Sequence, residues 1–224
     1  MKNYGIILAS GTGTRYGGDI PKQFVEISGR TILERTIDIF EKSSCIDSIV
    51  VVVTPEFRVL AQEIIEKNDY KKIEKILNGG KERKDSSYIG VNSIDEIEAN
   101  VLIHDCARPF VSLSVLEKCI KALEYHQAAG VAIPSTDTII EVENGIIKSI
   151  PPRKSLMRVQ TPQCFKLSLI KKAHELSKND SDFTDDCGLV LKHNLADIFV
   201  VEGNRENIKI TYPEDFKFAE IYAE

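Results

Sequence analysis

Hydrophobic and polar positions along the chain fall into alternating blocks that predict strands separated by helices. Continuous apolar runs at residues 6–8 and 48–53 are typical of strands buried on both faces of a sheet. Between them, residues 31–41 place apolar side chains at mostly helical spacing. Thr54-Pro55 then gives an N-cap and a proline at the first helical position, which indicates a helix to about residue 67.

The alternation continues through the second half of the chain. Further strands are predicted at residues 73–77, 101–103, 130–134, 198–201 and 207–211. Further helices are predicted after residue 86, from a Ser114/Glu117 capping box to about residue 125, after Thr184-Asp185-Asp186, and from Pro213 onward. Strands separated by helices form right-handed βαβ units. We therefore predict one α/β domain over residues 1–224, built on a mainly parallel sheet.

Residues 138–150 depart from this pattern. Two apolar-rich stretches flank Asn144-Gly145, which is a strong signal for a β-hairpin turn. We expect this hairpin, with its flanks at residues 136–153, to protrude from the sheet as an arm. Because an isolated two-stranded ribbon is marginally stable in water, we expect the arm to pack on a second copy and form a homodimer.

Charge and composition narrow the possible partners. The formal charge of −5 argues against a nucleic-acid binder, although it permits a local basic pocket. With no apolar run of membrane-spanning length and no charged-then-apolar leader, we expect a cytoplasmic protein. The five scattered cysteines show no metal-site spacing, so we expect reduced thiols.

Polar motifs follow three of the predicted strands, at residues 9–24, 79–86 and 104–109. The carboxyl ends of parallel strands meet at one edge of a sheet, where ligands bind. In the first motif, small residues allow backbone N–H groups to close on a phosphate, and Arg15 and Lys22 supply positive charge. We predict that this loop holds a nucleoside triphosphate.

Each motif also has a plainer explanation. The first loop is not a Walker loop, because no Gly-Lys-Ser/Thr follows, and no acidic residue ends the second strand as in a dinucleotide site. Asp105 either binds Mg²⁺ or caps a turn. Arg108 pairs with a phosphate or forms a structural salt bridge. Lys209 is an exposed strand lysine on pattern alone. Cys106 has no histidine clearly placed as its base, which argues against a nucleophile.

Several motifs nevertheless occur together and in order. They are Leu8-Ala-Ser-Gly-Thr-Gly-Thr-Arg15, Pro21-Lys-Gln-Phe24, His104-Asp-Cys-Ala-Arg-Pro109, Gln160-Thr-Pro-Gln163, Thr184-Asp-Asp186 and Asn207-Ile-Lys-Ile-Thr211. Over essentially the whole chain, this series resembles the family of cytidylyltransferases that act on 2-C-methyl-D-erythritol 4-phosphate and their relatives that act on ribitol 5-phosphate. The resemblance implies a Rossmann-like, three-layer nucleotidyltransferase fold.

The resemblance also implies roles for individual residues. The CTP phosphates would be held by the loop, and the cytosine and ribose by the second motif: Ala9, Ser10, Gly11, Thr12, Gly13, Gly79, Gly80 and Ser86. Arg15 and Lys22 match the family's catalytic cations, and Asp105 matches its Mg²⁺ ligand and also touches substrate. The polyol phosphate would be met by Arg108 and Lys209 and, from the arm of a partner subunit, by Thr138 and Arg153. Lys209 and Arg153 would also act in catalysis.

The implied reaction transfers CMP from CTP to a polyol phosphate and releases pyrophosphate. Ala107, Thr184-Asp185-Asp186 and the Pro213-Glu-Asp ending favour methylerythritol phosphate, an isoprenoid precursor. The absence of a basic residue before Asp137-Thr138, and the Ile150-Pro-Pro-Arg153 approach, lean towards ribitol 5-phosphate and the synthesis of CDP-ribitol for surface polymers. A hexose 1-phosphate nucleotidyltransferase and a non-catalytic nucleotide-binding module are the competing hypotheses.

Overall fold

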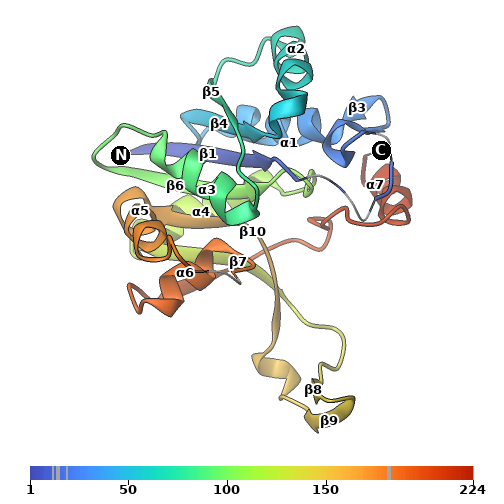
Figure 1. The fold of residues 1–224 in the computed structure, drawn as a ribbon, viewed down its shortest axis with the longest axis vertical. Helices are drawn as coiled ribbons and strands as arrows, with labels where there is room; N and C mark the ends of the chain where they lie inside the picture. Colours follow the sequence, from blue (N-terminus) through green and yellow to red (C-terminus); the bar gives the residue numbers. More distant parts are fainter. Residues whose placement is uncertain (12, 14–15, 19, 181–182, 224) are drawn as a thin grey trace.

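A single twisted sheet forms the centre of the protein (Figure 1). The computed structural model describes residues 1–11, 13, 16–18, 20–180 and 183–223. In this described part, seven strands pair in the order β11-β7-β10-β6-β1-β4-β5. All pairings are parallel except those of β10 with β6 and β7. The strands are β1 Lys2–Ala9, β4 Ser48–Val53, β5 Ile73–Asn78, β6 Ala99–Asp105, β7 Ala128–Pro134, β10 Met157–Lys166 and β11 Ile198–Glu202.

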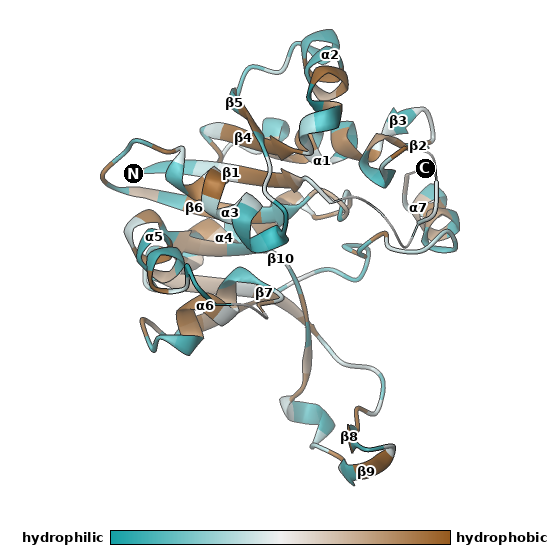
Figure 2. Cartoon of the chain, in the orientation of Figure 1, coloured by the Kyte–Doolittle hydropathy of each residue, from teal (hydrophilic) through white to brown (hydrophobic). Residues whose placement is uncertain are grey.

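Helices cover both faces of the sheet, which confirms the predicted three-layer α/β fold. One face packs on α1 Ile32–Lys42, α2 Arg58–Asn68, α4 Leu113–Ala122 and α7 Asp215–Ala223. The other packs on α3 Arg83–Asn92, α5 Leu167–Leu176 and α6 Asp186–Lys192. Successive strand residues point to opposite faces, so Ile7 joins the first layer and Ile6 the second. The end of β1 and most of β4 are therefore apolar on both faces, and both strands carry brown segments in Figure 2.

The remaining elements are short. They are η1 Lys22–Phe24, η2 Pro55–Phe57, η3 Arg153–Ser155 and the paired strands β2 Glu26–Ile27 and β3 Arg30–Thr31. In the described ranges, none of the helices combines the length and apolar composition that a membrane crossing requires.

Several local predictions need correction. The Ser114 capping box is wrong, because the N-cap of α4 lies two residues earlier, at Ser112, which accepts the hydrogen bond from Val115 N–H. Residues 207–211 extend along the sheet edge without pairing as a strand, and Ile210 N–H donates to the Ala107 carbonyl instead. The helix predicted from Pro55 is split into η2 and α2. Helix α5 follows β10 directly and was not among the predicted helices.

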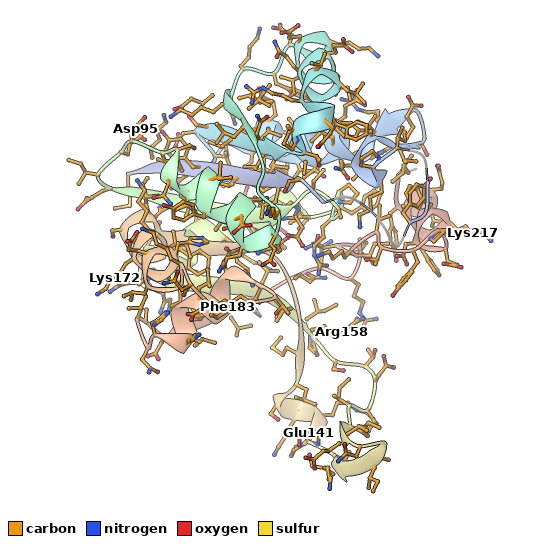
Figure 3. The ribbon with its side chains drawn as sticks, in the orientation of Figure 1. Asp95, Glu141, Arg158, Lys172, Phe183 and Lys217 are labelled. Carbon is orange, nitrogen blue, oxygen red and sulfur yellow. The ribbon has the colours of Figure 1, made fainter. Side chains whose placement is uncertain are left out.

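The predicted hairpin is confirmed. Its strands are β8 Glu141–Glu143 and β9 Ile146–Ser149, joined at Asn144 and Gly145 with φ of 51° and 77°. Positive φ at both positions is what a two-residue hairpin turn requires. The arm stands away from the body, with Glu141 at its far end and Arg158 near its base (Figure 3). Its large apolar side chains are exposed: Ile139, Ile140, Val142, Ile146, Ile147 and Ile150.

Candidate active site

A pocket of about 280 Å³ opens at the carboxyl ends of β1 and β6. Its described lining contains four cations and two carboxylates, so it is locally positive in a protein with a net charge of −5. Such a pocket attracts polyanions. The lining residues are Leu8, Ala9, Ser10, Gly11, Gly13, Lys22, Gln23, Lys81, Glu82, Arg83, Asp105, Cys106, Ala107, Lys209 and Thr211.

The loop after β1 and the segment after β5 meet at two serines. Ser10 Oγ lies 2.6 Å from Ser86 Oγ, which also accepts the Gly80 N–H at 3.2 Å. A Cβ on Gly79 would lie 2.4 Å from the Ser10 Cβ, so this close approach requires glycine. Ser86 is fully buried, and the predicted trio of Gly79, Gly80 and Ser86 supports the wall behind Ser10. These three residues are not part of the pocket lining. Lys81, Glu82 and Arg83, which directly follow Gly80, do line the pocket.

Two side chains of η1 fasten the glycine-rich loop. Gln23 Nε2 donates to the Ala9 carbonyl at 2.7 Å and to the Gly11 carbonyl at 3.0 Å. Lys22 Nζ donates to the Ile210 carbonyl at 2.6 Å and lines the pocket. The loop and the 207–211 segment are thereby brought together. The predicted residues Thr12 and Arg15 lie outside the described residues.

Asp105 is held between two cations. Its Oδ1 lies 2.9 Å from Arg83 Nε, and its Oδ2 lies 2.6 Å from Lys209 Nζ. Burial alone would raise the pKa of this carboxyl, but the two adjacent cations hold the pKa well below its usual range. Asp105 therefore presents an ionised carboxylate to the pocket, and Lys209 contacts it while its own side chain stays 38% exposed.

The backbone at Asp105 is also fixed. Asp105 N–H donates to Thr161 Oγ1 at 3.1 Å, and the Thr161 hydroxyl donates in turn to His104 Nδ1 at 3.0 Å. His104 Nε2–H donates to the Arg108 carbonyl at 3.0 Å, which sets the tautomer. Burial lowers the pKa of His104 to about 4, so this ring is neutral near pH 7. Thr161 of the Gln160-Thr-Pro-Gln163 motif thus supports the backbone of Asp105 and the ring of His104.

Arg108 lies outside the pocket lining. Its Nη1 donates to the Asn207 carbonyl at 2.8 Å and its Nη2 to the Val159 carbonyl at 3.2 Å. Among the described residues the alternative of a structural salt bridge is not seen, and both of these partners are backbone carbonyls. Nε is buried and has no hydrogen-bond partner within the described part of the chain. Arg108 therefore links the 207–211 segment to β10, the strand that follows the arm.

Thr138 and Arg153 lie together on the arm. Arg153 Nη2 donates to Thr138 Oγ1 at 2.9 Å. Neither side chain is among those lining the pocket of its own chain. The structure therefore brings these two predicted residues to each other but not to Lys22, Asp105 or Lys209.

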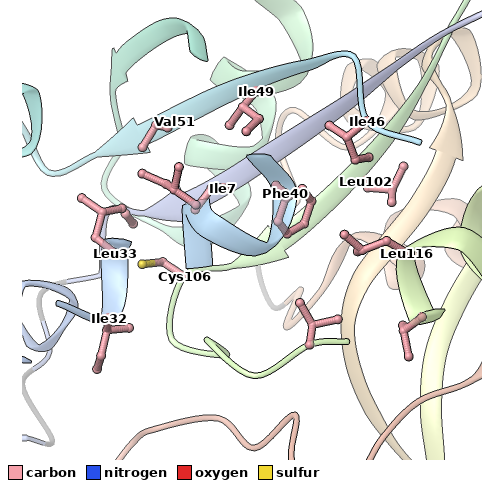
Figure 4. Close-up of a cluster of buried hydrophobic side chains, with 14 of the residues drawn as sticks. Ile7, Ile32, Leu33, Phe40, Ile46, Ile49, Val51, Leu102, Cys106 and Leu116 are labelled. Atoms are coloured by element: carbon pink, nitrogen blue, oxygen red, sulfur yellow. The ribbon is translucent and has the colours of Figure 1, made fainter. Parts of the chain in front are cut away.

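Cys106 belongs to the core. Figure 4 shows its side chain beside Leu33, in the cluster that joins α1 to the sheet. The residue is 1% exposed, and burial raises the pKa of its thiol to about 12. A protonated, enclosed thiol is a poor nucleophile, which agrees with the interpretation of this cysteine as structural. The five cysteines are all free.

The donor set of the pocket suits a metal ion that arrives with a ligand. Within the described ranges, no group of three or more histidine, cysteine or acidic side chains could hold a metal by itself. Mg²⁺ is commonly bound through one or two carboxylates together with substrate phosphates. The ionised Asp105 carboxylate at the pocket fits that pattern. Asp105 Oδ2 is paired with the Lys209 ammonium in this structure, so a metal ion at Asp105 would share the carboxylate with that ammonium.

The pocket contains residues that sequence reasoning missed. Lys81, Glu82 and Arg83 follow the glycine pair and line the pocket, and Thr211 contributes from the edge segment. Lys81 and Arg83 are basic residues in a polar segment that follows a strand, and this position could have identified them as pocket residues. The pairing of Arg83 with Asp105 and with Asp186 had none, because its partners are 22 and 103 residues away.

Comparison with known proteins places the whole chain in one group. The family profile described as 2-C-methyl-D-erythritol 4-phosphate cytidylyltransferase matches residues 4–224. A protein of that name from Clostridium perfringens is 42% identical over 218 residues, covering 96% of each chain. The crystal structure of 4-diphosphocytidyl-2C-methyl-D-erythritol synthase from Anaerococcus prevotii superposes with a TM-score of 0.88 at 31% identity, covering 99% of this chain and 96% of that one.

A second kind of relative is also similar. The bifunctional ribulose 5-phosphate reductase/CDP-ribitol pyrophosphorylase from Haemophilus influenzae is 39% identical over 226 residues. The match covers 98% of this chain and 48% of that protein, so the chain spans about half of that relative's length.

Proposed function

The chain belongs to the 2-C-methyl-D-erythritol 4-phosphate cytidylyltransferase family, and on this premise we propose that it transfers CMP from CTP to 2-C-methyl-D-erythritol 4-phosphate. Pyrophosphate is the second product. The observation that carries the proposal is the cation-rich pocket at the carboxyl ends of β1 and β6, flanked by a loop of small residues. A polyphosphate and a phosphomonoester both need such a surface in order to meet.

In the reaction, a phosphate oxygen of the polyol attacks the α-phosphorus of CTP in line, forming a P–O bond as the bond to the pyrophosphate oxygen breaks. Both reactants are anions, so the enzyme works by holding them together and stabilising the charge that spreads in the transition state. Lys22 and Arg15 act on the triphosphate, and the loop residues 9–13 bind its oxygens through backbone N–H groups. Gly79, Gly80 and Ser86 shape the wall that receives the nucleoside.

Mg²⁺ would be held by Asp105 together with phosphate oxygens, and it would offset the charge of the triphosphate. Lys209, now paired with Asp105, lies where an incoming phosphomonoester can also be met. Arg108, which joins the 207–211 segment to the arm strand, serves the same phosphate. These assignments follow the family's pattern at matching positions.

A second copy completes the site in this proposal. Thr138 and Arg153 lie together on an arm whose apolar face is exposed, so a homodimer would cover that face and bring Arg153 to the partner's polyol phosphate. Arginine pairs well with phosphate because its planar fork donates two parallel hydrogen bonds. The arm therefore contributes both to assembly and to substrate binding.

Ribitol 5-phosphate is the second candidate substrate. It is favoured by the similarity to the Haemophilus relative, whose name includes CDP-ribitol pyrophosphorylase, and by the arm residues that precede Thr138 and Arg153. The two substrates carry a phosphate on a short polyhydroxy chain, so the same cations suit both. The polyol-facing surface, rather than the CTP loop, distinguishes them.

The deciding experiment measures pyrophosphate release from CTP and Mg²⁺ with each polyol phosphate in turn. We expect the larger kcat/KM with 2-C-methyl-D-erythritol 4-phosphate and little release when UTP or GTP replaces CTP. A larger value with ribitol 5-phosphate would move the assignment to the second candidate. No release with either substrate, while calorimetry shows CTP bound, would overturn the transferase proposal in favour of a nucleotide-binding module.

A further inference from the structure

An ion pair joins the buried carboxylate of Asp186, at the start of α6, to Arg83, at the start of α3. Asp186 is 1% exposed, and its Oδ2 lies 2.7 Å from Arg83 Nη1. Its other oxygen, Oδ1, accepts the hydroxyl of Ser87 and lies 3.6 Å from His174 Nε2. Asp186 is not among the residues that line the pocket. Arg83, which does line the pocket, connects this carboxylate to it.

Arg83 connects this buried carboxylate to the pocket. The same guanidinium that donates from Nη1 to Asp186 donates from Nε to Asp105 Oδ1 at 2.9 Å. Burial alone would lower the pKa of Arg83, but the carboxylates of Asp186 and Asp105 raise it above its usual value. Two carboxylates at different edges of one planar group fix its plane. Asp105 is thereby held from one side by Arg83 and from the other by Lys209.

The backbone of Asp186 is fixed to the sheet as well. Gln163 Oε1 accepts the Asp186 N–H at 2.8 Å, and Gln163 Nε2 donates to Asp185 Oδ2 at 2.7 Å. Gln163 lies on β10 opposite Ile103 of β6, two residues before Asp105. These hydrogen bonds attach the first turn of α6 to β10, which pairs with β6, the strand that carries Asp105.

A buried carboxylate costs desolvation energy, and a pair of buried charges is often no more stabilising than apolar residues of the same volume. Stability alone therefore does not account for Asp186. For the pocket, the pair sets the direction in which Arg83 holds Asp105.

We propose that Asp186 is a positioning residue of the active site, acting through Arg83 on the orientation of Asp105. This inference rests on the transferase function proposed above. It assigns a role to the Thr184-Asp185-Asp186 motif beyond helix capping, and it divides that motif. Asp185 caps α6, since its Oδ1 accepts the Gly188 N–H at 2.9 Å, whereas Asp186 serves the pocket.

The motif provides its own matched control. Asp185→Asn weakens the attachment of α6 to Gln163 without touching Arg83, whereas Asp186→Asn removes the charge that faces Arg83. Misplacement of a reacting or charge-bearing group by about 1 Å can cost about 100-fold in rate. We expect Asp186→Asn to lower kcat roughly 10- to 100-fold with a change of less than about threefold in the KM for CTP. We expect Asp185→Asn to keep kcat within about twofold.

A double-mutant cycle separates positioning from a general structural role. Arg83→Met removes the group through which Asp186 acts, so Asp186→Asn should lower kcat little further in the Arg83→Met background. All four proteins are compared at a temperature at which each is folded. Independent, multiplying losses in kcat would overturn the proposal, as would equal kcat losses in Asp186→Asn and Asp185→Asn. Should Asp186→Asn not fold, Ser87→Ala, which removes a donor to the same carboxylate, replaces it with an expected loss of a few-fold in kcat.

A measurement without substrates tests the ion pair independently of the transferase function. The Arg83 Nε–H signal, identified by its loss in Arg83→Lys, should exchange slowly with solvent in the unmodified protein and in Asp185→Asn, and faster in Asp186→Asn. No polyol-phosphate activity in the unmodified protein with this exchange pattern would remove the proposed function while the ion pair stands. Full activity with unchanged exchange in Asp186→Asn would remove the positioning role alone.

Discussion

The sheet-edge pocket and the arm place charged groups in opposite surroundings. Asp105 is 8% exposed, and its carboxylate, backbone and neighbouring histidine are each held by hydrogen bonds from β10, α3 or the 207–211 segment. Arg153 on the arm is exposed and donates to Thr138, and the same arm exposes isoleucines such as Ile146 at 62%. The pocket is organised within one chain, whereas the arm presents its groups to something outside it.

This difference indicates how the proposed site is divided. In the proposed site, the CTP half would depend on burial and on charge pairs within one chain, which is the kind of preorganisation that stabilises a transition state. The polyol half would depend on an exposed apolar surface that a second copy would cover. Variants in the two regions should therefore fail in different ways.

The largest effect is expected at Lys22. Lys22→Ala should lower kcat about 100- to 1,000-fold, because removal of one preorganised donor to a developing charge costs that much. Pyrophosphate release measures the loss, and circular dichroism with thermal unfolding checks that the fold is retained. Near-normal turnover in the folded variant would place Lys22 outside the mechanism.

A smaller loss of activity is expected for substitution of Arg153, and mixing with a second variant should restore part of it. Arg153→Ala should reduce kcat/KM for the polyol phosphate about 10- to 100-fold, as for the loss of a charged hydrogen bond. Mixing Arg153→Ala chains with Lys22→Ala chains should restore activity to about a quarter of the unmodified level, since half of the dimers are mixed and each has one intact site.

The control for this mixture is each variant alone at the same total concentration. Native mass spectrometry shows whether mixed dimers form. Mixed dimers without recovered activity would contradict a site shared between chains and would confine catalysis to the body.

The close packing of the body predicts a stability effect that the arm should not show. A Cβ on Gly90 of α3 would lie 2.6 Å from Ile6 Cγ2 and 3.2 Å from Val52 Cγ2. Gly90→Ala should therefore lower the free energy of unfolding by about 1–3 kcal/mol, measured by urea titration. Ile147→Ser, at a 56% exposed position of the arm, should change it by less than about 0.5 kcal/mol at concentrations too low for dimers. Equal losses would contradict the distinction between the regions.

The smallest expected effect is the pH dependence contributed by His174. Burial lowers the pKa of this ring in the folded protein below the value of about 6.5 that it has when unfolded. As pH falls through 6.5, the unfolded chain binds a proton that the folded chain does not, so stability falls. The unmodified protein should lose more stability between pH 7 and pH 5 than His174→Gln does. Parallel urea curves for the two proteins would contradict this.

Much of the fold could be predicted from the sequence because its signals are local. The apolar run at residues 48–53, the helical spacing at 31–41 and the Asn144-Gly145 turn each specify an element within a few residues. The placement of three polar motifs at strand ends then followed from the geometry of parallel sheets. Residues 207–211 were misjudged, since alternation predicts an extended backbone but not whether a partner strand is available.

The sequence by itself therefore determined the layers, the edge at which the pocket lies and the existence of the arm. The tertiary structure decided which charges meet: Lys209 with Asp105, Arg83 with both Asp105 and Asp186, and Arg108 with two backbone carbonyls. Periodicity is a property of neighbouring residues, whereas these partners are brought together by the path of the chain across the sheet. Their pKa values and geometry depend on burial that no local pattern records.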